Sequence, residues 1–234
     1  MNRFFGQIFV IAVCVATATS SLSATATDYY NDGIAKQSKG DLEGALVDYS
    51  KAIQLKPAFA VAYNNRGVCK RQKGDFDGAI ADETEAIRTK PDLASAYDNR
   101  GNAKLDKNDF DGAIADHTKA IELKPTFDTA YYGRGKAKQV KGDLDGAITD
   151  YTKAIALKPD YYLAYNNRSA AKLHKDDLAG AIEDADKAIE LKPTYYPAYV
   201  SRGNAKQKKG DYAGTRADYA KADELKASAG KLSQ

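Results

Sequence analysis

GDFDGAIAD, residues 74–82, places three aspartates and two glycines in nine positions. Variants of the same stretch recur along the chain, at 40–48 (GDLEGALVD), 108–116 (NDFDGAIAD), 142–150 (GDLDGAITD), 176–184 (DDLAGAIED) and, more weakly, 210–218 (GDYAGTRAD). Aspartate and glycine in close succession are found both in calcium loops and at helix starts. The copies are therefore either a row of cation sites or a row of identical structural units.

The spacing of residues after Asp75 excludes an EF-hand calcium loop. Such a loop requires an oxygen ligand, a glycine and a glutamate where this chain has Ala79, Ile80 and Ala86. A helix start fits better, because an aspartate at the N-cap accepts hydrogen bonds from free amides and a first-turn carboxylate complements the helix dipole. The stretch therefore predicts a repeated helix N-terminus.

A spacing of 34 residues organises almost the whole chain. Five prolines keep this period, namely Pro57, Pro91, Pro125, Pro159 and Pro193, and so do six tyrosines, Tyr29, Tyr63, Tyr97, Tyr131, Tyr165 and Tyr199. The glycines at 33, 67, 101, 135 and 203 follow the same period, with Ser169 in the remaining place. The chain therefore divides into six units, 26–59, 60–93, 94–127, 128–161, 162–195 and 196–229.

Each unit is predicted to hold two helices. In the fourth unit a first helix over 129–141 stops at Gly142, which tolerates the left-handed conformation of a helix C-terminus. Asp143 is the expected N-cap of the second helix and Asp145 lies in its first turn. Apolar residues at helical spacing follow until Pro159 ends the helix. The sequence predicts an all-α protein of six helix-turn-helix units.

The unit resembles the tetratricopeptide repeat (TPR), whose pattern is W-x2-L-G-x2-Y…A-x3-F…P with a 34-residue period. Tyr131, Gly135, Ala147, Tyr151 and Pro159 match it in the fourth unit. We expect the glycine and the alanine to let the two helices of a unit approach closely. The resemblance implies a right-handed superhelix, an α-solenoid, whose first helices line a concave groove that holds a partner's peptide or helix.

Several positions depart from the TPR pattern. Tyrosine replaces the tryptophan throughout, arginine replaces the leucine from the second unit on, and lysine replaces the second aromatic residue. Glu83 and His117 replace the aromatic residue of the second helix in units two and three. We therefore expect looser packing around those two units.

A periodic set of charges indicates contacts between neighbouring units. The second helices carry Asp48, Asp82, Asp116, Asp150, Asp184 and Asp218, and the first helices carry Arg66, Arg100, Arg134, Arg168 and Arg202. We predict that each aspartate pairs with the arginine 18 residues later, in the following unit, as in Asp48 with Arg66. The first unit has no predecessor, and it has Asp32 in place of the arginine. The alternative is a set of unconnected surface charges.

The last unit has the features expected of a terminal repeat. Ile148 and Ile155 of the fourth unit, which we expect to cover the first helix of the next unit, correspond to Arg216 and Asp223 in the sixth. A repeat array needs a polar face where it ends. The TPR domain is therefore assigned to 27–229, followed by a short tail at 230–234.

The resemblance also marks candidate partner-binding residues. The family's groove positions vary between units while the packing positions hardly change, which favours an unrepeated binding surface over neutral drift of exposed positions. These positions are Tyr30, Ile34, Val61, Asn64, Val68, Arg71, Asp98, Asn102, Leu105, Tyr132, Lys136, Gln139, Leu163, Asn166, Ala170, Leu173, Val200 and Asn204. The asparagines are suited to bind the backbone of an extended peptide, and the aliphatic residues offer apolar contact.

The N-terminal segment predicts export. Residues 1–26 begin with Arg3, continue through a short apolar run and end in small residues, as in a secretory signal peptide with cleavage after Ala26. The alternative is a retained membrane anchor, for which the apolar run is short. Cleavage would leave 34 basic and 32 acidic residues, a net charge of +2, which does not indicate a nucleic acid or membrane partner. We expect a periplasmic or secreted protein.

The chain shows no catalytic motif or cofactor motif. His117 occupies a packing position and His174 lies near the end of a first helix, so neither indicates a metal site. Cys69 stands where the other units have alanine, which predicts a small, buried, inert residue. The sequence therefore predicts a non-enzymatic, monomeric scaffold without cofactor or metal that binds a protein or an extended peptide. The alternative is a structural or self-associating repeat protein.

Overall fold

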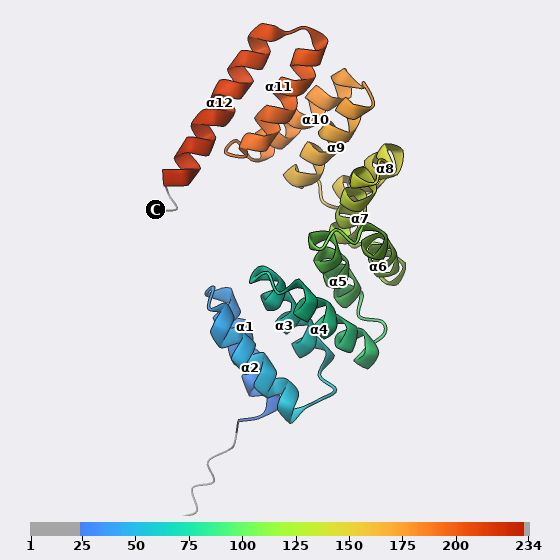
Figure 1. Ribbon diagram of the computed structural model, residues 1–234, viewed down its shortest axis with the longest axis vertical. Coiled ribbons are helices and arrows are strands. Elements are labelled where there is room, and N and C mark those ends of the chain that lie inside the picture. Colours follow the sequence, from blue (N-terminus) through green and yellow to red (C-terminus); the bar gives the residue numbers. More distant parts are fainter. Residues whose placement is uncertain (1–23, 232–234) are drawn as a thin grey trace, which may run out of the picture.

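The computed structural model describes residues 24–231, which form twelve α-helices in tandem (Figure 1). The helices are α1 (Ala26–Ser38), α2 (Leu42–Leu55), α3 (Ala60–Gln72), α4 (Phe76–Thr89), α5 (Ala94–Asp106), α6 (Phe110–Leu123), α7 (Asp128–Val140), α8 (Leu144–Leu157), α9 (Tyr162–His174), α10 (Leu178–Leu191), α11 (Tyr196–Lys209) and α12 (Tyr212–Lys231). No strand occurs in this part of the chain. The predicted all-α fold of six helix pairs is confirmed.

The repeated Asp-Gly stretch forms the start of each second helix. Asp143 caps α8 by accepting a hydrogen bond from the amide of Gly146 at 2.9 Å, and Asp145 lies in the first turn. The preceding Gly142 adopts a left-handed conformation with φ +84°. In repeats 3 and 5 Asn108 and Asp176 take this conformation instead, with φ 61° and 68°. The repeated aspartates are helix caps, as predicted.

Small residues bring the two helices of a repeat together. A Cβ atom on Gly135 would lie 2.8 Å from Cε1 of Tyr151, so only glycine allows α7 to pack on that ring. Ala147 and Tyr151 are fully buried. The Tyr151 hydroxyl donates to Oε1 of Gln139 at 2.7 Å. This close approach confirms the expectation for the glycine and the alanine.

Apolar residues of each second helix cover the next repeat. Ile155 forms a buried cluster with Ala164 of α9, and Tyr165 packs against it. In the last repeat the corresponding Asp223 is exposed, and so is Arg216. The final helix pair therefore presents a polar surface where the array ends, as predicted.

The last helix is longer than expected. α12 has 20 residues, whereas the other second helices have 14, and it continues to Lys231 although a tail was predicted from residue 230. Ala227 stands where the earlier repeats have proline, so nothing in the backbone stops the helix there. The remainder of the predicted tail, 232–234, lies outside the described residues. So does most of the predicted signal peptide at 1–26.

The predicted pairing of aspartate with the arginine of the following repeat is wrong. Arg134 donates from Nε and Nη2 to Asp150 of its own repeat, at 2.9 and 2.7 Å, and Lys138 lies 2.8 Å from the same carboxylate. Nη1 reaches back to the previous repeat and donates to Oγ1 of Thr118 at 3.2 Å. The arginine and lysine of one repeat already occupy both oxygens of this carboxylate, so Asp150 does not pair with the arginine of the next repeat.

The six helix pairs follow an arc (Figure 1). Each odd-numbered helix comes into backbone contact with the next odd-numbered helix, whereas none of the even-numbered helices in residues 24–231 contacts the next even-numbered one. The odd-numbered helices are therefore closer together and form the concave side. No helix within this range combines the length and apolar character needed to cross a membrane.

Candidate functional site: the concave surface

The candidate groove residues all lie on odd-numbered helices. Their environments divide them into buried polar residues, polar residues with partners inside the molecule, and accessible apolar or cationic residues. The accessible apolar residues include Ile34, whose exposed fraction is 41%, and the half-buried Val61, Val68, Leu105, Leu163, Ala170, Leu173 and Val200. These residues form the apolar part of the surface.

Three of the candidates are buried. The exposed fractions of Asn64, Asp98 and Asn166 are 8%, 5% and 7%. Oδ1 of Asn64 accepts a hydrogen bond from Asn99 at 3.1 Å, and Oδ1 of Asn166 accepts one from Ser201 at 2.9 Å. These asparagines therefore join neighbouring repeats and present little polar surface to a peptide.

The same contacts form a ladder along the concave side. Each rung joins a residue of one odd-numbered helix to the residue 35 positions later on the next: Tyr30 with Asn65, Asn64 with Asn99, Tyr132 with Asn167, and Asn166 with Ser201. The rung between repeats 3 and 4 is missing because Gly133 stands in its second place. The ladder therefore has two separate halves.

His117 explains this glycine. A Cβ atom on Gly133 would lie 2.4 Å from Cε1 of His117, so the ring occupies the space that a side chain there would need. Nδ1 of His117 lies 2.9 Å from Oδ1 of Asp98, and the histidine is completely buried. Residues 24–231 contain no group of three potential metal ligands. The histidine packs in the core, as predicted, and nothing in the sequence indicated its contact with Asp98.

Other candidate residues have partners inside the molecule. Arg71 pairs with Asp106 of the next repeat at 2.6 Å. The Tyr219 hydroxyl donates to Oδ1 of Asn204 at 2.6 Å, and Asn102 donates to Asp98 at 3.5 Å. Each amide uses one polar atom in these bonds: Asn204 keeps its Nδ2 as a donor, and Asn102 keeps its Oδ1 as an acceptor.

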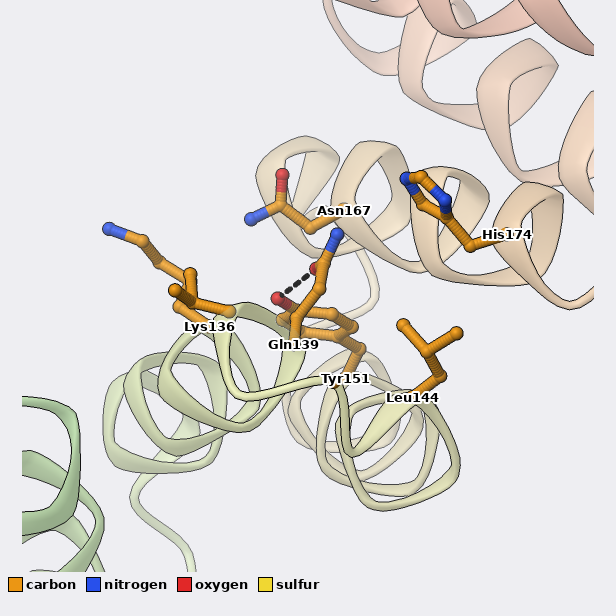
Figure 2. Close-up of a pocket in the computed structure, with 8 residues that line it drawn as sticks. Lys136, Gln139, Leu144, Tyr151, Asn167 and His174 are labelled. Carbon is orange, nitrogen blue, oxygen red and sulfur yellow. Dashed lines mark hydrogen bonds between the residues drawn. The ribbon is translucent and has the colours of Figure 1, made fainter.

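A pocket of about 510 Å³ opens between repeats 4 and 5. Its walls come from the end of α7, the start of α8 and the facing side of α9, and it is lined by Lys136, Gln139, Val140, Gly142, Leu144, Tyr151, Asn167 and His174. Figure 2 shows Lys136 and His174 on opposite sides, with Tyr151 and Gln139 hydrogen-bonded between them. Lys136, Val140 and His174 are exposed. The pocket combines apolar walls with a cationic rim.

Tyr151 of this pocket and Tyr132, whose ring centroid lies 5.9 Å from that of Tyr151, are both neutral. Burial raises the pKa of Tyr132 to about 12 and holds the pKa of Tyr151 well above its usual range. Both phenols therefore keep their protons at neutral pH. Nδ2 of Asn167 donates to the Tyr132 hydroxyl at 3.1 Å.

Sequence reasoning found Lys136 and Gln139 but missed the other wall of the pocket. Val140, Leu144 and His174 lie at helix ends, beyond the groove positions carried over from the family. A usable signal was available, because Val140 stands where most other repeats have a polar residue. An apolar residue beside a turn indicates either a contact or an exposed patch.

Comparison with known proteins settles the family. A family model described as TPR repeat matches residues 35–69, 101–139 and 140–175. The crystal structure of MamA is 31% identical with a TM-score of 0.63, over 70% of this chain and 96% of that one. The chain belongs to the TPR family. No match was found among curated proteins.

Other solved structures resemble this TPR protein to different degrees. YrrB, described as a TPR protein with an unusual peptide-binding site, is 25% identical with a TM-score of 0.59, over 74% of this chain and 89% of that one. PilW, described as a type IV pilus biogenesis factor, is 17% identical with a TM-score of 0.77, over 83% and 90%. The likeness to PilW concerns the fold alone.

Proposed function

We propose that this TPR protein is a non-enzymatic scaffold that binds an extended segment of another protein on its concave surface. The observation that carries the proposal is the pocket between repeats 4 and 5. Val140, Leu144 and Tyr151 form apolar walls, and Lys136 supplies a positive charge at the rim. Such a site suits an apolar side chain next to an acidic one. The peptide-binding site named in the description of YrrB supports this reading.

The remaining candidate groove residues either contact the peptide or hold neighbouring repeats together. Asn102 and Asn204 bind the peptide backbone, because each keeps a free polar atom outside its internal bond. Asn64 and Asn166 hold neighbouring repeats together instead. Leu105 of α5 and Leu173 of α9, both half-buried, supply further apolar contact.

The proposed setting is outside the cytoplasm. Arg3, the apolar run after it and the small residues before Ala26 support export and cleavage. The near-neutral charge after cleavage supports a protein partner over a nucleic acid. We propose a monomer in the periplasm or outside the cell.

Selection from a random peptide library tests the proposal. We expect the full chain to select peptides that carry an apolar residue beside an acidic one. The variant Lys136→Ala, Val140→Ser, His174→Ala changes only exposed residues of the pocket, so it should fold normally and bind these peptides at least about tenfold more weakly.

A matched control removes the same number of exposed side chains from the even-numbered helices. The variant Lys119→Ala, Glu122→Ala, Lys153→Ala should bind like the wild type. Equal loss in both variants, or selected peptides without an apolar residue, would contradict the proposal. A mass that rises with concentration in light scattering, together with no selected peptide, would favour the structural or self-associating alternative.

A further inference from the structure

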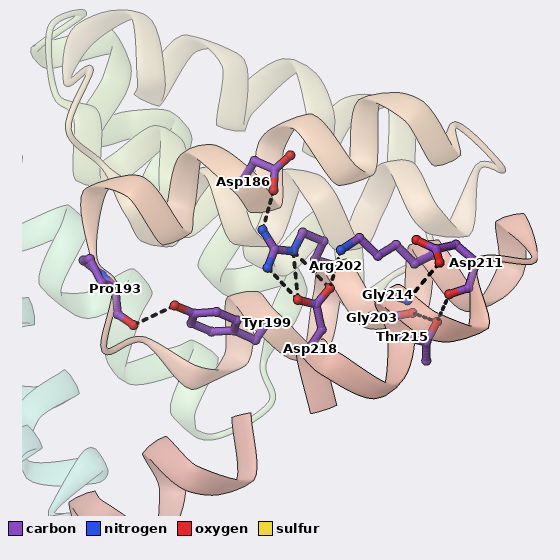
Figure 3. Close-up of polar contacts among 10 residues, drawn as sticks. Asp186, Pro193, Tyr199, Arg202, Gly203, Asp211, Gly214, Thr215 and Asp218 are labelled. Atoms are coloured by element: carbon purple, nitrogen blue, oxygen red, sulfur yellow. Dashed lines mark hydrogen bonds and ion pairs between the residues drawn. The ribbon is translucent and has the colours of Figure 1, made fainter. Parts of the chain in front are cut away.

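Repeats 2 to 6 each contain the same arginine site. The guanidinium lies 5.4–5.7 Å from the ring of the tyrosine three residues before it, and it pairs with the aspartate sixteen residues after it. Its remaining nitrogen donates to the previous repeat, to Ser50, Thr84, Thr118, Thr152 or Asp186. Figure 3 shows this arrangement for Arg202, between Asp186 and Asp218.

Repeat 1 has the same site without the arginine. Tyr29 and Asp48 hold the positions of the tyrosine and the aspartate, but Asp32 stands where the arginine would be. The exposed fraction of Asp48 is 6%. Among the described residues only Lys36 pairs with it, at 2.7 Å. A buried carboxylate that receives an arginine and a lysine in five repeats receives only a lysine here.

The lysine of repeat 1 is more exposed than its equivalents, because the arginine is missing from this repeat. The exposed fraction of the Lys36 side chain is 42%, whereas it is 19–24% for the five lysines at the same position in the other repeats. The arginine of those repeats covers the lysine and the carboxylate together. In repeat 1 the lysine is more exposed, and the exposed fraction of the Asp48 side chain is 9%, compared with 3–6% for the aspartate side chain in the other five repeats.

The open site continues into a pocket of about 740 Å³ along α2. Tyr29 and Asp48 line it, together with Glu43, Leu46, Val47, Ser50, Lys51 and Gln54. Val47 has an exposed fraction of 67%, so the pocket also has an apolar border. The charged residues of the lining are Glu43, Asp48 and Lys51, and the two carboxylates pair with Lys73 and Lys36.

We propose that this pocket binds the guanidinium of an arginine side chain carried by another protein. An aromatic ring beside a buried carboxylate is the environment that the chain itself provides for five arginines. A guanidinium forms two parallel hydrogen bonds to a carboxylate and stacks on a ring, which an ammonium group cannot do. The apolar border at Leu46 and Val47 suits the neighbouring residues of a polypeptide, so a protein segment fits better than free arginine.

A titration monitored by NMR tests this proposal. The probes are N-acetyl-arginine methylamide and the matching lysine compound, each added to the full chain up to about 50 mM, a range that covers millimolar affinity. We expect saturable shifts of the Tyr29 and Asp48 signals with the arginine probe, at least about fivefold tighter than with the lysine probe.

Asp32→Arg is the matched variant, because it restores the arginine of the other five repeats. We expect it to abolish binding of the arginine probe and to raise the Tm by about 2–4 °C. If this variant does not fold, Asp48→Asn provides the same test, because it removes the charge at nearly constant shape.

The outcomes are distinct. Equal shifts with both probes, or binding that survives in both variants, would overturn the proposal. Arg3→Ala distinguishes another occupant: a response that appears only in this variant would mean that the chain's own Arg3 fills the pocket, which also overturns binding of a partner. The absence of a saturable shift with the arginine probe, in the wild type and in every variant, would also overturn the proposal.

Discussion

Repeats 2 and 4 have the same backbone frame and fill the same core position with different side chains. In repeat 4, Tyr151 is completely buried against Gly135, and its hydroxyl donates to Gln139. In repeat 2, Glu83 takes that place against Gly67 with an exposed fraction of 1%. The helix lengths are identical in the two repeats.

The two side chains differ in whether their polar atoms have hydrogen-bond partners. No hydrogen-bond partner within residues 24–231 reaches either carboxylate oxygen of Glu83. Burial, with a smaller contribution from the charge of Asp82, raises the pKa of Glu83 to about 10. The carboxyl group is therefore neutral at pH 7, and the unpaired buried polar atoms cost free energy.

A repeat therefore has a backbone frame, which the two repeats share, and a core side chain, which differs between them. Helix caps, the glycine contact and the arginine cluster are the same in both repeats, and they fix the backbone. The side chain at the core position then sets how stable the individual repeat is, since a solenoid sums local contributions. A different side chain at the core position can therefore weaken one part of the concave surface and leave its shape intact.

The largest expected effect comes from truncating the two side chains. Tyr151→Ala should lower the free energy of unfolding by about 3–5 kcal/mol, because it leaves a cavity. Glu83→Ala should cost at most about 1 kcal/mol, because it also removes unpaired polar atoms. Urea unfolding followed by helical circular dichroism measures both, with the exposed Tyr212→Ala as control. Equal losses at positions 83 and 151 would break the comparison.

The arginine cluster belongs to the shared frame and should respond equally in both repeats. Arg66→Met and Arg134→Met should each cost about 3 kcal/mol, because each leaves a buried aspartate short of a partner.

Double-mutant cycles then locate the partner of the arginine. Arg134 should couple to Asp150 by about 1–3 kcal/mol and to Asp116 by less than about 0.5 kcal/mol. The reverse order would mean that the cluster joins consecutive repeats through the aspartate.

The pH dependence of stability should come from repeat 2. The folded protein holds the Glu83 proton up to about pH 10, whereas the unfolded chain releases it near the usual pKa of 4.5. Stability from this group is complete below pH 4.5 and is lost as the pH rises toward 10.

Glu83→Gln removes this titration. Between pH 6 and 8 the wild type should lose stability relative to Glu83→Gln by up to about 2.7 kcal/mol, the limit for one proton. The stability difference between the wild type and Tyr151→Phe should not change over this range, since Tyr151→Phe keeps Glu83 and the pKa of Tyr151 lies above the range. Parallel pH profiles for the wild type and Glu83→Gln would contradict the assignment.

Introducing the core tyrosine and glutamine of repeat 4 into repeat 2 should raise the free energy of unfolding. Position 71 corresponds to Gln139, so Glu83→Tyr with Arg71→Gln recreates the hydrogen-bonded pair. We expect a gain of about 1–2 kcal/mol, because a phenol with a partner replaces unpaired buried atoms. Either single substitution should gain less, and a loss in the double variant would show that the two frames differ.

The smallest effect is expected outside both repeats, at the start of α1. Thr25 accepts a hydrogen bond from the Asp28 amide at 3.2 Å and forms a capping box there. Thr25→Ala should cost about 1 kcal/mol, measured by thermal unfolding. An unchanged Tm would contradict this prediction. Cleavage after Ala26 would also remove Thr25, so an unchanged Tm would mean that the start of α1 tolerates cleavage there.

The sequence predicts those features of the fold that depend on nearby residues. Asp143 as a cap, Gly135 as a contact and Ile155 as a cover all follow from local spacing. The partner of Arg134 does not, because the aspartates at 116 and 150 belong to one 34-residue series and periodicity treats them alike. The burial of Asn64, one of the candidate groove residues, could not be predicted either, since it depends on Asn99 of the next repeat.

Hydrogen exchange of the native full chain at pH 8 tests the central claim most directly, which is that one frame holds cores of unequal strength. The amides of α4 should exchange at least about tenfold faster than those of α8 after correction for intrinsic rates, and Glu83→Gln should narrow the gap. Equal protection of α4 and α8, or faster exchange in α8, would contradict the account.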